Sequence, residues 1–389
     1  MKTTPLILLA GLLGLAGLVH TQGAPFNSGS TESLGDLVIT NDTVLEMPPD
    51  GIYNCKKFQI VSNALLTFHR NPLNTPVYFL ASGDVLIDGR IDVSGGPGSA
   101  ANGGLGGPGG FNGGKPGSSD IPPGAGFGPG GGKGGTSFDS NRQDGAGSGS
   151  YKAVNGNGGS TLKGAPYGTP VLIPLVGGSG GGGTFGAPGQ GGGGGGGAIL
   201  IASSTKITFG PSAQLISVGG ARTVNFNGGS GGAVRVVAPV IVGTVNSSVQ
   251  GEGTYAGLGR IRVDTLDASA TGFAVFPPDA LSVGALMATG LANAPKLDIL
   301  AAAGTTIPEG NPTPVSVLLP NGSSTNQTVT VQAKNFGTKV PINVVLIPDY
   351  GDPIVFPAEI DNTTKNPATV DIPVILPINV PVSVNAWTR

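Results

Sequence analysis

The sequence predicts an all-β protein, in which a right-handed parallel β-helix (a β-solenoid) with a long glycine-rich insertion is followed by a small immunoglobulin-like β-sandwich. Three observations predict this class. Apolar residues do not recur at the three- and four-residue spacing of an amphipathic helix. Three segments of roughly 20 residues resemble one another. Finally, 43 of the 72 glycines lie between Gly95 and Gly197, which marks that stretch as an insertion.

The first 23 residues have the parts of a secretory signal peptide. Lys2 precedes an apolar stretch from Leu6 to Val19, and the small residues Gly23 and Ala24 follow. The stretch is short for a bilayer span, and we expect no membrane span once residues 1–23 are removed. The protein is therefore expected to be secreted or held at the cell surface.

The net charge and the cysteine content limit which partners and cofactors we expect for this protein. The formal net charge is −2, and Lys and Arg form no cluster, so we expect no nucleic acid partner. Cys55 is the single cysteine, which excludes an intramolecular disulfide and a metal site built on paired thiolates. The sequence indicates no metal and no cofactor.

Residues 24–277 are assigned to the β-solenoid because of the internal repeat. The segments Val77–Gly96, Ala198–Gly220 and Ala233–Gly253 each contain an apolar strand, a second short apolar pair, a turn and a third strand that stops at glycine. Phe58–Phe68 looks like an earlier, degenerate copy. Three short strands per unit are typical of one solenoid coil, whose apolar residues stack on those of the next coil. We therefore expect the aliphatic residues of these segments to form continuous ladders.

The glycine-rich insertion, residues 95–197, begins and ends at one corner of the predicted coil. In "NGGLGGPGGFNGGKPG" glycine pairs recur every three residues, which is the period of the polyproline II helix. A compact layer of glycine helices and a mobile loop both remain open. Phe111, Phe127 and Tyr151 are the candidate ligand-surface residues, since exposed aromatic side chains on a surface of low charge suit contact with sugars or proteins.

Residues 278–297 are expected to be a connector, either a short helix or an irregular segment. The residue pattern changes after it. Residues 298–389 carry alternating apolar and polar residues in short segments, with turns at 321–322, 349–352 and 362–366. Five strands are expected, beginning with "PVSVLL" and ending with "PVSVNAW". This spacing predicts the immunoglobulin-like sandwich.

Asp84, Asp88 and Asp92 are the densest carboxylates of the predicted solenoid and the candidates for an enzymatic site. If Gly89 is a corner, Asp88 and Asp92 lie on different faces and cannot form the opposed pair of a glycosidase. His69 is the one histidine beyond the leader, and no serine lies in a nucleophile-elbow context. No residue is therefore assigned as catalytic.

With the coil pattern and the junction "GGGGGGGAILIAS" in view, the chain resembles glycine-rich secreted bacterial β-helical surface proteins, some of them adhesin-like. The likeness covers about Phe58 to Leu266. A smaller likeness is to phage-tail adhesins and glycine-rich antifreeze proteins that bundle polyglycine helices. Neither resemblance carries functional residues over to this sequence.

The expected function is that of a non-catalytic secreted or cell-surface protein, structural or adhesive, whose β-helical spine displays a glycine-rich surface. Its partners would be extracellular glycans or surface proteins, and self-association is a further expectation. Two alternatives stay open. One is a carbohydrate-active β-helix enzyme, a polysaccharide lyase or hydrolase, using Asp84, Asp88 or Asp92. The other is a subunit of an extracellular filament or matrix.

Overall fold

The computed structural model describes residues 25–136, 146–153, 162–186, 189–221, 228–251 and 256–389. The leader assignment and parts of the insertion thus lie outside the described residues. Within the described ranges the chain is all-β, and its one helical element is the 3₁₀ turn η1 (Pro278–Ala280). None of these residues forms a helix with the length and apolar character needed to cross a bilayer.

Parallel strands make up the first part of the chain, which we call the column (residues 36–284). Its ten-stranded sheet contains, in spatial order, β1 (Asp36–Ile39), β4 (Lys57–Ile60), β7 (Val85–Ile87), β10 (Lys206–Phe209), β13 (Val240–Ser248), β11 (Gln214–Ile216), β8 (Arg90–Asp92), β5 (Leu65–His69) and β2 (Thr43–Glu46), with β15 (Thr271–Phe276) also paired to β13. Its six-stranded sheet contains β16 (Leu281–Gly284), β14 (Arg260–Asp264), β12 (Ala233–Val237), β9 (Ala198–Ser203), β6 (Val77–Ala81) and β3 (Ile52–Cys55).

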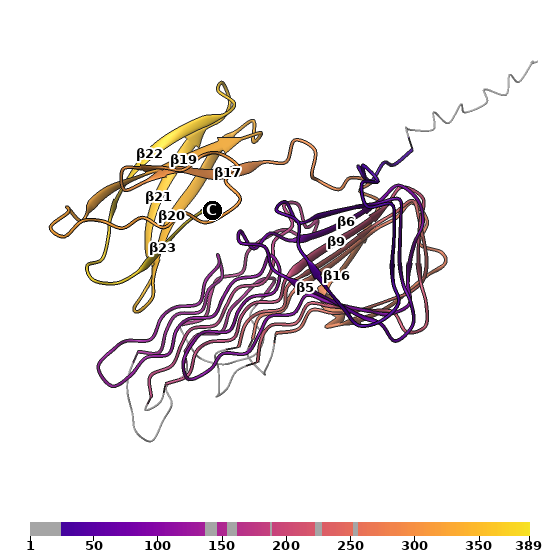
Figure 1. Cartoon of the computed structure of the whole chain (residues 1–389), viewed down its shortest axis with the longest axis horizontal. Helices are drawn as coiled ribbons and strands as arrows, with labels where there is room; N and C mark the ends of the chain where they lie inside the picture. The colour runs from indigo at the N-terminus through magenta and orange to yellow at the C-terminus, as the bar shows by residue number, and fades with distance from the viewer. Residues whose placement is uncertain (1–24, 137–145, 154–161, 187–188, 222–227, 252–255) are drawn as a thin grey trace, which may run out of the picture.

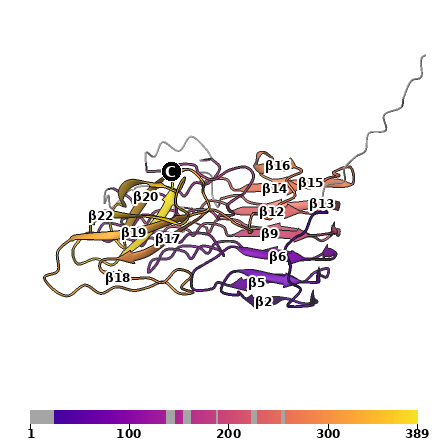
Figure 2. The same ribbon diagram turned by 90° about the horizontal axis from the view of Figure 1, so that it is seen from above.

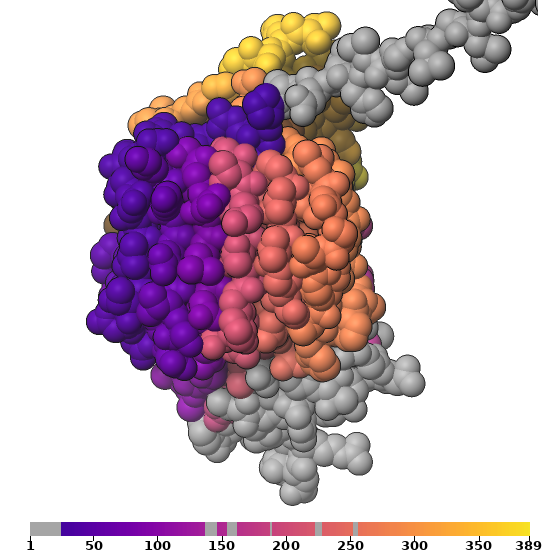
Figure 3. All heavy atoms as spheres, turned by 90° about the vertical axis from the view of Figure 1, so that its right-hand side faces the viewer, coloured from indigo at the N-terminus to yellow at the C-terminus, as the bar shows by residue number. Residues whose placement is uncertain are grey.

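From β1 to β10, each strand of the column pairs in parallel with the strand three places later in the sequence. The long strand β13 then pairs with both β10 and β11. The chain therefore visits three faces in turn and returns to the first one strand spacing further along. Figure 1 looks along this stack, so successive circuits overlap as one three-sided outline. Seen from the side, the same circuits lie one above another from β2 to β16 (Figure 2). In the space-filling view they form parallel slabs, from indigo at one end to orange at the other (Figure 3).

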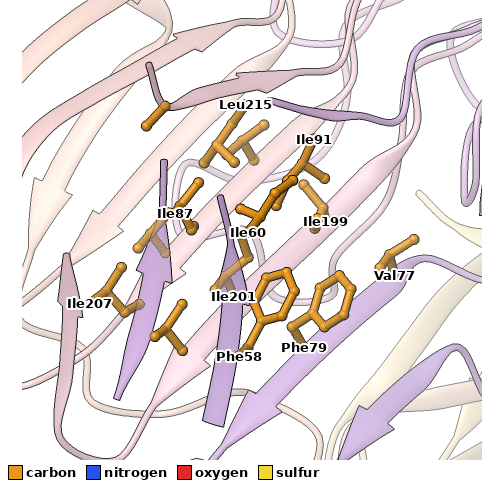
Figure 4. Packing of buried hydrophobic residues seen from close by; sticks show 14 of the residues in the cluster. Phe58, Ile60, Val77, Phe79, Ile87, Ile91, Ile199, Ile201, Ile207 and Leu215 are labelled. Carbon is orange, nitrogen blue, oxygen red and sulfur yellow. The ribbon is translucent and has the colours of Figure 1, made fainter. Parts of the chain in front are cut away.

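The three repeated segments of the sequence pair in parallel with one another, as the repeat predicted. Val234 lies beside Ile199 and Val236 beside Ile201 on one face, and Ile207 lies beside Ile241 on another. These side chains are buried in a continuous apolar core. Figure 4 shows aliphatic side chains from different circuits pointing toward one another, with Phe58 and Phe79 together at one side.

The six-stranded sheet is buried on both faces, which explains why β9 and β12 are almost entirely apolar. Alternate side chains enter the core of the column, while Leu200 and Val237 point to the other face and join a second apolar cluster. That cluster is completed by Leu172 and Leu175 of the insertion. The insertion thus covers the sheet as well as projecting from it.

The column extends beyond its predicted end at residue 277, and its first circuit lies within the predicted residues 24–277. Its first circuit begins with β1 and precedes the earliest copy recognised in the sequence. At the other end β16 pairs with β14, so that the column continues to Gly284 and the irregular connector begins only after it. The recognised repeats end in a glycine tract, whereas β2 and β15 are followed by Pro-Pro, at residues 48–49 and 277–278, so these circuits did not match the repeat pattern.

The last hundred residues form two antiparallel sheets around a separate core, which we call the C-terminal unit. One sheet contains β18 (Thr305–Thr306), β17 (Lys296–Ala302), β19 (Asn326–Lys334) and β22 (Ala368–Ile375); the other contains β21 (Ile354–Asp361), β20 (Lys339–Pro348) and β23 (Val382–Thr388). Four of the expected strands are present. The expected strand "PVSVLL" is not: residues 314–319 form no strand, and Leu318 is 95% exposed.

Candidate functional site

Extended glycine-rich segments leave one corner of the column and pack side by side (Figure 1). We call them the glycine bundle. Its described segments lie at residues 93–136, 146–153, 162–186, 189–197, 217–221, 228–232, 249–251 and 256–259. Most of the insertion that the sequence left open between a compact layer and a mobile loop is therefore packed.

Pairing within the bundle repeats every third residue. In the segment 189–197, the amides of residues 191, 194 and 197 donate to carbonyls in the segment 93–99, at 2.7 to 3.0 Å. The amides of residues 192 and 195 donate instead to the segment 111–114. A neighbour met at every third residue defines a helix of three residues per turn, which is the geometry of polyproline II.

The same segment is enclosed on all sides. Hydrogen bonds or close glycine contacts join it to segments near residues 96, 104, 113, 180, 220 and 230. A Cβ on any residue from Gly191 to Gly197 would lie only 1.9 to 2.6 Å from an atom of a neighbour. The run of seven glycines is what a fully enclosed helix of this kind requires, because no face has room for a side chain.

An outer segment needs glycine on its inner faces only. In "NGGLGGPGG", residues 102–110, every third residue is not glycine, and two of these, Asn102 and Leu105, are exposed, Leu105 by 60%. Pro97, on the adjoining segment, is exposed beside them. These three residues form an outer row of the bundle that could contact a ligand.

The predicted ligand-surface residues lie elsewhere. Tyr151 is 1% exposed, so its prediction as a surface residue is wrong: its ring packs against Tyr167 at 4.7 Å between centroids, and the Arg260 guanidinium lies 5.5 Å from the ring centroid. Burial raises the pKa of the Tyr167 hydroxyl. Phe111 and Phe127 are half-buried within the bundle. The Phe111 ring lies against Gly128 and the Tyr151 ring against Gly168.

Asp84, Asp88 and Asp92 do not converge. The Asp84 carboxylate accepts a hydrogen bond from the Thr205 hydroxyl at 2.6 Å. The Asp88 carboxylate accepts from the amide of Ser212 at 3.0 Å. The Asp92 carboxylate accepts from the amide of Ser94 at 2.8 Å.

Each of these three carboxylates lies at a different position of the circuit, before β7, between β7 and β8, and in β8. They hold turns, and they are not the opposed pair that glycoside hydrolysis needs. His69 is equally peripheral: its Nδ1 lies 2.5 Å from Oε1 of Glu46 on the neighbouring strand, and both side chains are more than half exposed.

A buried ion network that the sequence did not indicate lies on the six-stranded sheet. The side chains of Arg235 and Asp264 are fully buried and meet at 3.1 Å, and Arg262 donates to the other Asp264 oxygen at 2.6 Å. Arg235 also donates to the carbonyl of Ala288 at 2.7 Å, and Asp264 accepts from the Leu286 amide. The network fastens the connector to the sheet. Burial lowers the pKa of Arg235, and its bond with Asp264 opposes that effect.

No group of three or more metal-ligating side chains occurs among the described residues. No family model matches this chain, and neither a curated protein nor a solved structure matches it. The candidate site is the exposed outer row of Pro97, Asn102 and Leu105.

Proposed function

We propose that this protein is a non-catalytic, secreted or cell-surface structural protein with an adhesive surface. The column would be its rigid spine, and the glycine bundle a panel that displays outer rows of side chains. The observation that supports this best is the enclosure of the segment 189–197, since such packing fills the centre of the bundle with backbone and leaves the outer segments to display exposed side chains such as Leu105.

The spine is proposed to be a right-handed parallel β-helix. Support comes from the strand order, in which every third strand pairs in parallel, and from the strong preference of parallel crossovers for the right hand. The C-terminal unit is proposed to be immunoglobulin-like, on the basis of its four- and three-stranded antiparallel sheets around one core. Such a unit would serve as a spacer or attachment module.

The proposed ligands are extracellular glycans or surface proteins. Leu105 and Pro97 offer apolar contact, and Asn102 offers an amide that can donate and accept hydrogen bonds. No charged side chain interrupts this row. The contact would suit neutral sugar rings or an uncharged protein surface better than an anionic polymer.

Localisation and binding can be tested together. The chain with its own leader should be recovered outside the cell or be removed by external protease; retention inside would contradict export. Leu105→Glu should weaken binding to a glycan array or to whole cells by about tenfold or more. The matched control is Leu34→Glu, at a leucine of similar exposure just before the first strand of the column, which should bind as the unmodified chain does.

Equal binding by the Leu105→Glu and Leu34→Glu chains would remove the outer row as the site. Turnover of a uronic-acid polymer that disappears in Asp84→Asn or Asp88→Asn would favour the enzymatic alternative instead. We expect no turnover, since the turn hydrogen bonds described above occupy both carboxylates.

A further inference from the structure

The two ends of the column differ in how well the core is covered. At the first end, the inward-facing residues Ile39, Met47 and Tyr53 are each less than 9% exposed. At the last end, Phe273 is 37% exposed and Val283 is 44% exposed. Leu37 and Leu45 at the first end are only partly buried, and Ala280 at the last end is buried. The described residues thus cover the core less completely at the last circuit than at the first.

The exposed residues of the last circuit belong to the core by register. Phe273 lies beside Val245 and Val283 beside Val263, and both of those valines are fully buried. Phe273 and Val283 therefore continue the buried ladders to the surface. An uncovered core of this kind is an apolar patch of the type that marks interaction sites.

The last circuit also presents unpaired strand edges. Among the described residues, β15 pairs only with β13 and β16 only with β14. Neither strand contains a charged residue or a proline, which are the devices that normally keep an edge strand from pairing with another chain. The edge is open both to hydrogen bonding and to apolar contact.

The first circuit is protected instead. Asp36 and Glu46 lie in its edge strands β1 and β2, and Asp42 and Asp50 lie in the turns beside them. The last circuit has no lysine or arginine between residues 265 and 285 to attract these carboxylates. Charge therefore gives no reason for the last end of one chain to meet the first end of another.

We infer that the last circuit is a self-association surface, and that two copies of this chain meet there end to end, related by a twofold axis. Such an isologous contact uses the same patch on both copies, so assembly stops at the dimer. It covers the exposed core on both chains at once. Antiparallel pairing of edge strands across the axis would satisfy backbone groups that are otherwise left to water.

Sedimentation velocity on the exported chain tests this inference, from about 1 to about 100 µM. We expect a monomer–dimer equilibrium and no larger species. Val283→Lys should raise the dissociation constant by about tenfold or more, because it places a charge in the apolar contact. The matched control, Val44→Lys, changes an exposed valine of strand β2 at the opposite end and should leave dimerisation unchanged.

Phe273→Lys provides a second variant if Val283→Lys does not fold, since the Phe273 side chain is already 37% exposed in the single chain. A monomer at all concentrations, growth beyond the dimer, or loss of the dimer in Val44→Lys would each overturn the inference. The last two results would instead indicate head-to-tail stacking. Dimerisation does not depend on ligand binding at Leu105. The sedimentation result and the ligand-binding result therefore test separate proposals.

Discussion

The enclosure of the segment 189–197 leads to a sharp prediction for Gly195→Ala. A Cβ on Gly195 would lie 1.9 Å from the carbonyl oxygen of Gly178 and 2.2 Å from its carbon. These are backbone atoms of another enclosed segment, so no side-chain rotation can relieve the overlap. The neighbouring backbone would have to move by about 1 Å, and overpacking of this kind typically costs about 1–3 kcal/mol and occasionally more.

Gly96→Ala is the matched control. Gly96 lies in the same bundle, but the nearest atom to its Cβ would be the Leu105 oxygen at 3.5 Å, an ordinary contact. A replacement of glycine by alanine without strain stabilises a protein by about 0.4–1 kcal/mol through the unfolded chain. The two alanine variants, identical in composition, should therefore differ in unfolding free energy by about 1.4–4 kcal/mol.

Urea unfolding followed by circular dichroism measures this difference, and hydrogen exchange locates it. In Gly195→Ala, protection of amides in the segments 176–184 and 189–197 should fall, because the two segments separate. Exchange in Gly96→Ala should match the unmodified chain. If the two variants unfold within about 0.5 kcal/mol of each other, the close packing of these segments is refuted.

Three other predictions concern ionisable groups and ion pairs. Asp264→Asn leaves Arg235 buried without a charged partner and should destabilise the chain to urea by about 3–5 kcal/mol; a loss of less than about 1 kcal/mol would contradict the network. Burial raises the pKa of the Cys55 thiol to about 11 and that of Tyr78 to about 12. The folded state therefore holds protons that the unfolded chain releases, and stability should be complete below pH 9 and fall toward pH 11; Cys55→Ala should flatten that fall in a pH series of melting temperatures. Lys115→Ala removes a pair with Asp349 of the C-terminal unit at 2.5 Å and should speed proteolysis of the connector while changing the melting temperature little.

The sequence predicted the parallel column because each circuit repeats the same apolar positions. Ile199 and Ile201 could be matched with Val234 and Val236 by eye, and the register of β9 and β12 follows that match. The first and last circuits escaped notice because they lack the glycine tract that ends each recognised repeat: β2 and β15 are followed by Pro-Pro instead.

The site was harder to predict because glycine has no side chain to show which way it faces. Tyr151 was expected on the surface from its low-charge surroundings, yet it fills the seam between bundle and sheet beside Tyr167. The spacing of the residues that are not glycine did indicate which segments are exposed. Where every third residue is not glycine, as at Asn102 and Leu105, the segment is at the surface; where none is, as from Gly191 to Gly197, it is enclosed.

The column also explains how so many glycines can be ordered at all. Glycine loses more conformational freedom on folding than any other residue, and an isolated polyproline II helix has no internal hydrogen bonds to offset that loss. Here the segments leave the column already paired: the amide of Val93 donates to Ile216, that of Gly95 to Val218, and that of Gly219 to Gln250.

Parallel strand pairing thus continues from the column into the bundle. The column holds the start of each segment beside the start of its neighbour. Bringing the segments together therefore costs little further loop-closure entropy. The bundle should therefore lose order when the column is loosened, as by Asp264→Asn, whereas Gly195→Ala should disturb the bundle and leave exchange in β9 and β12 nearly unchanged.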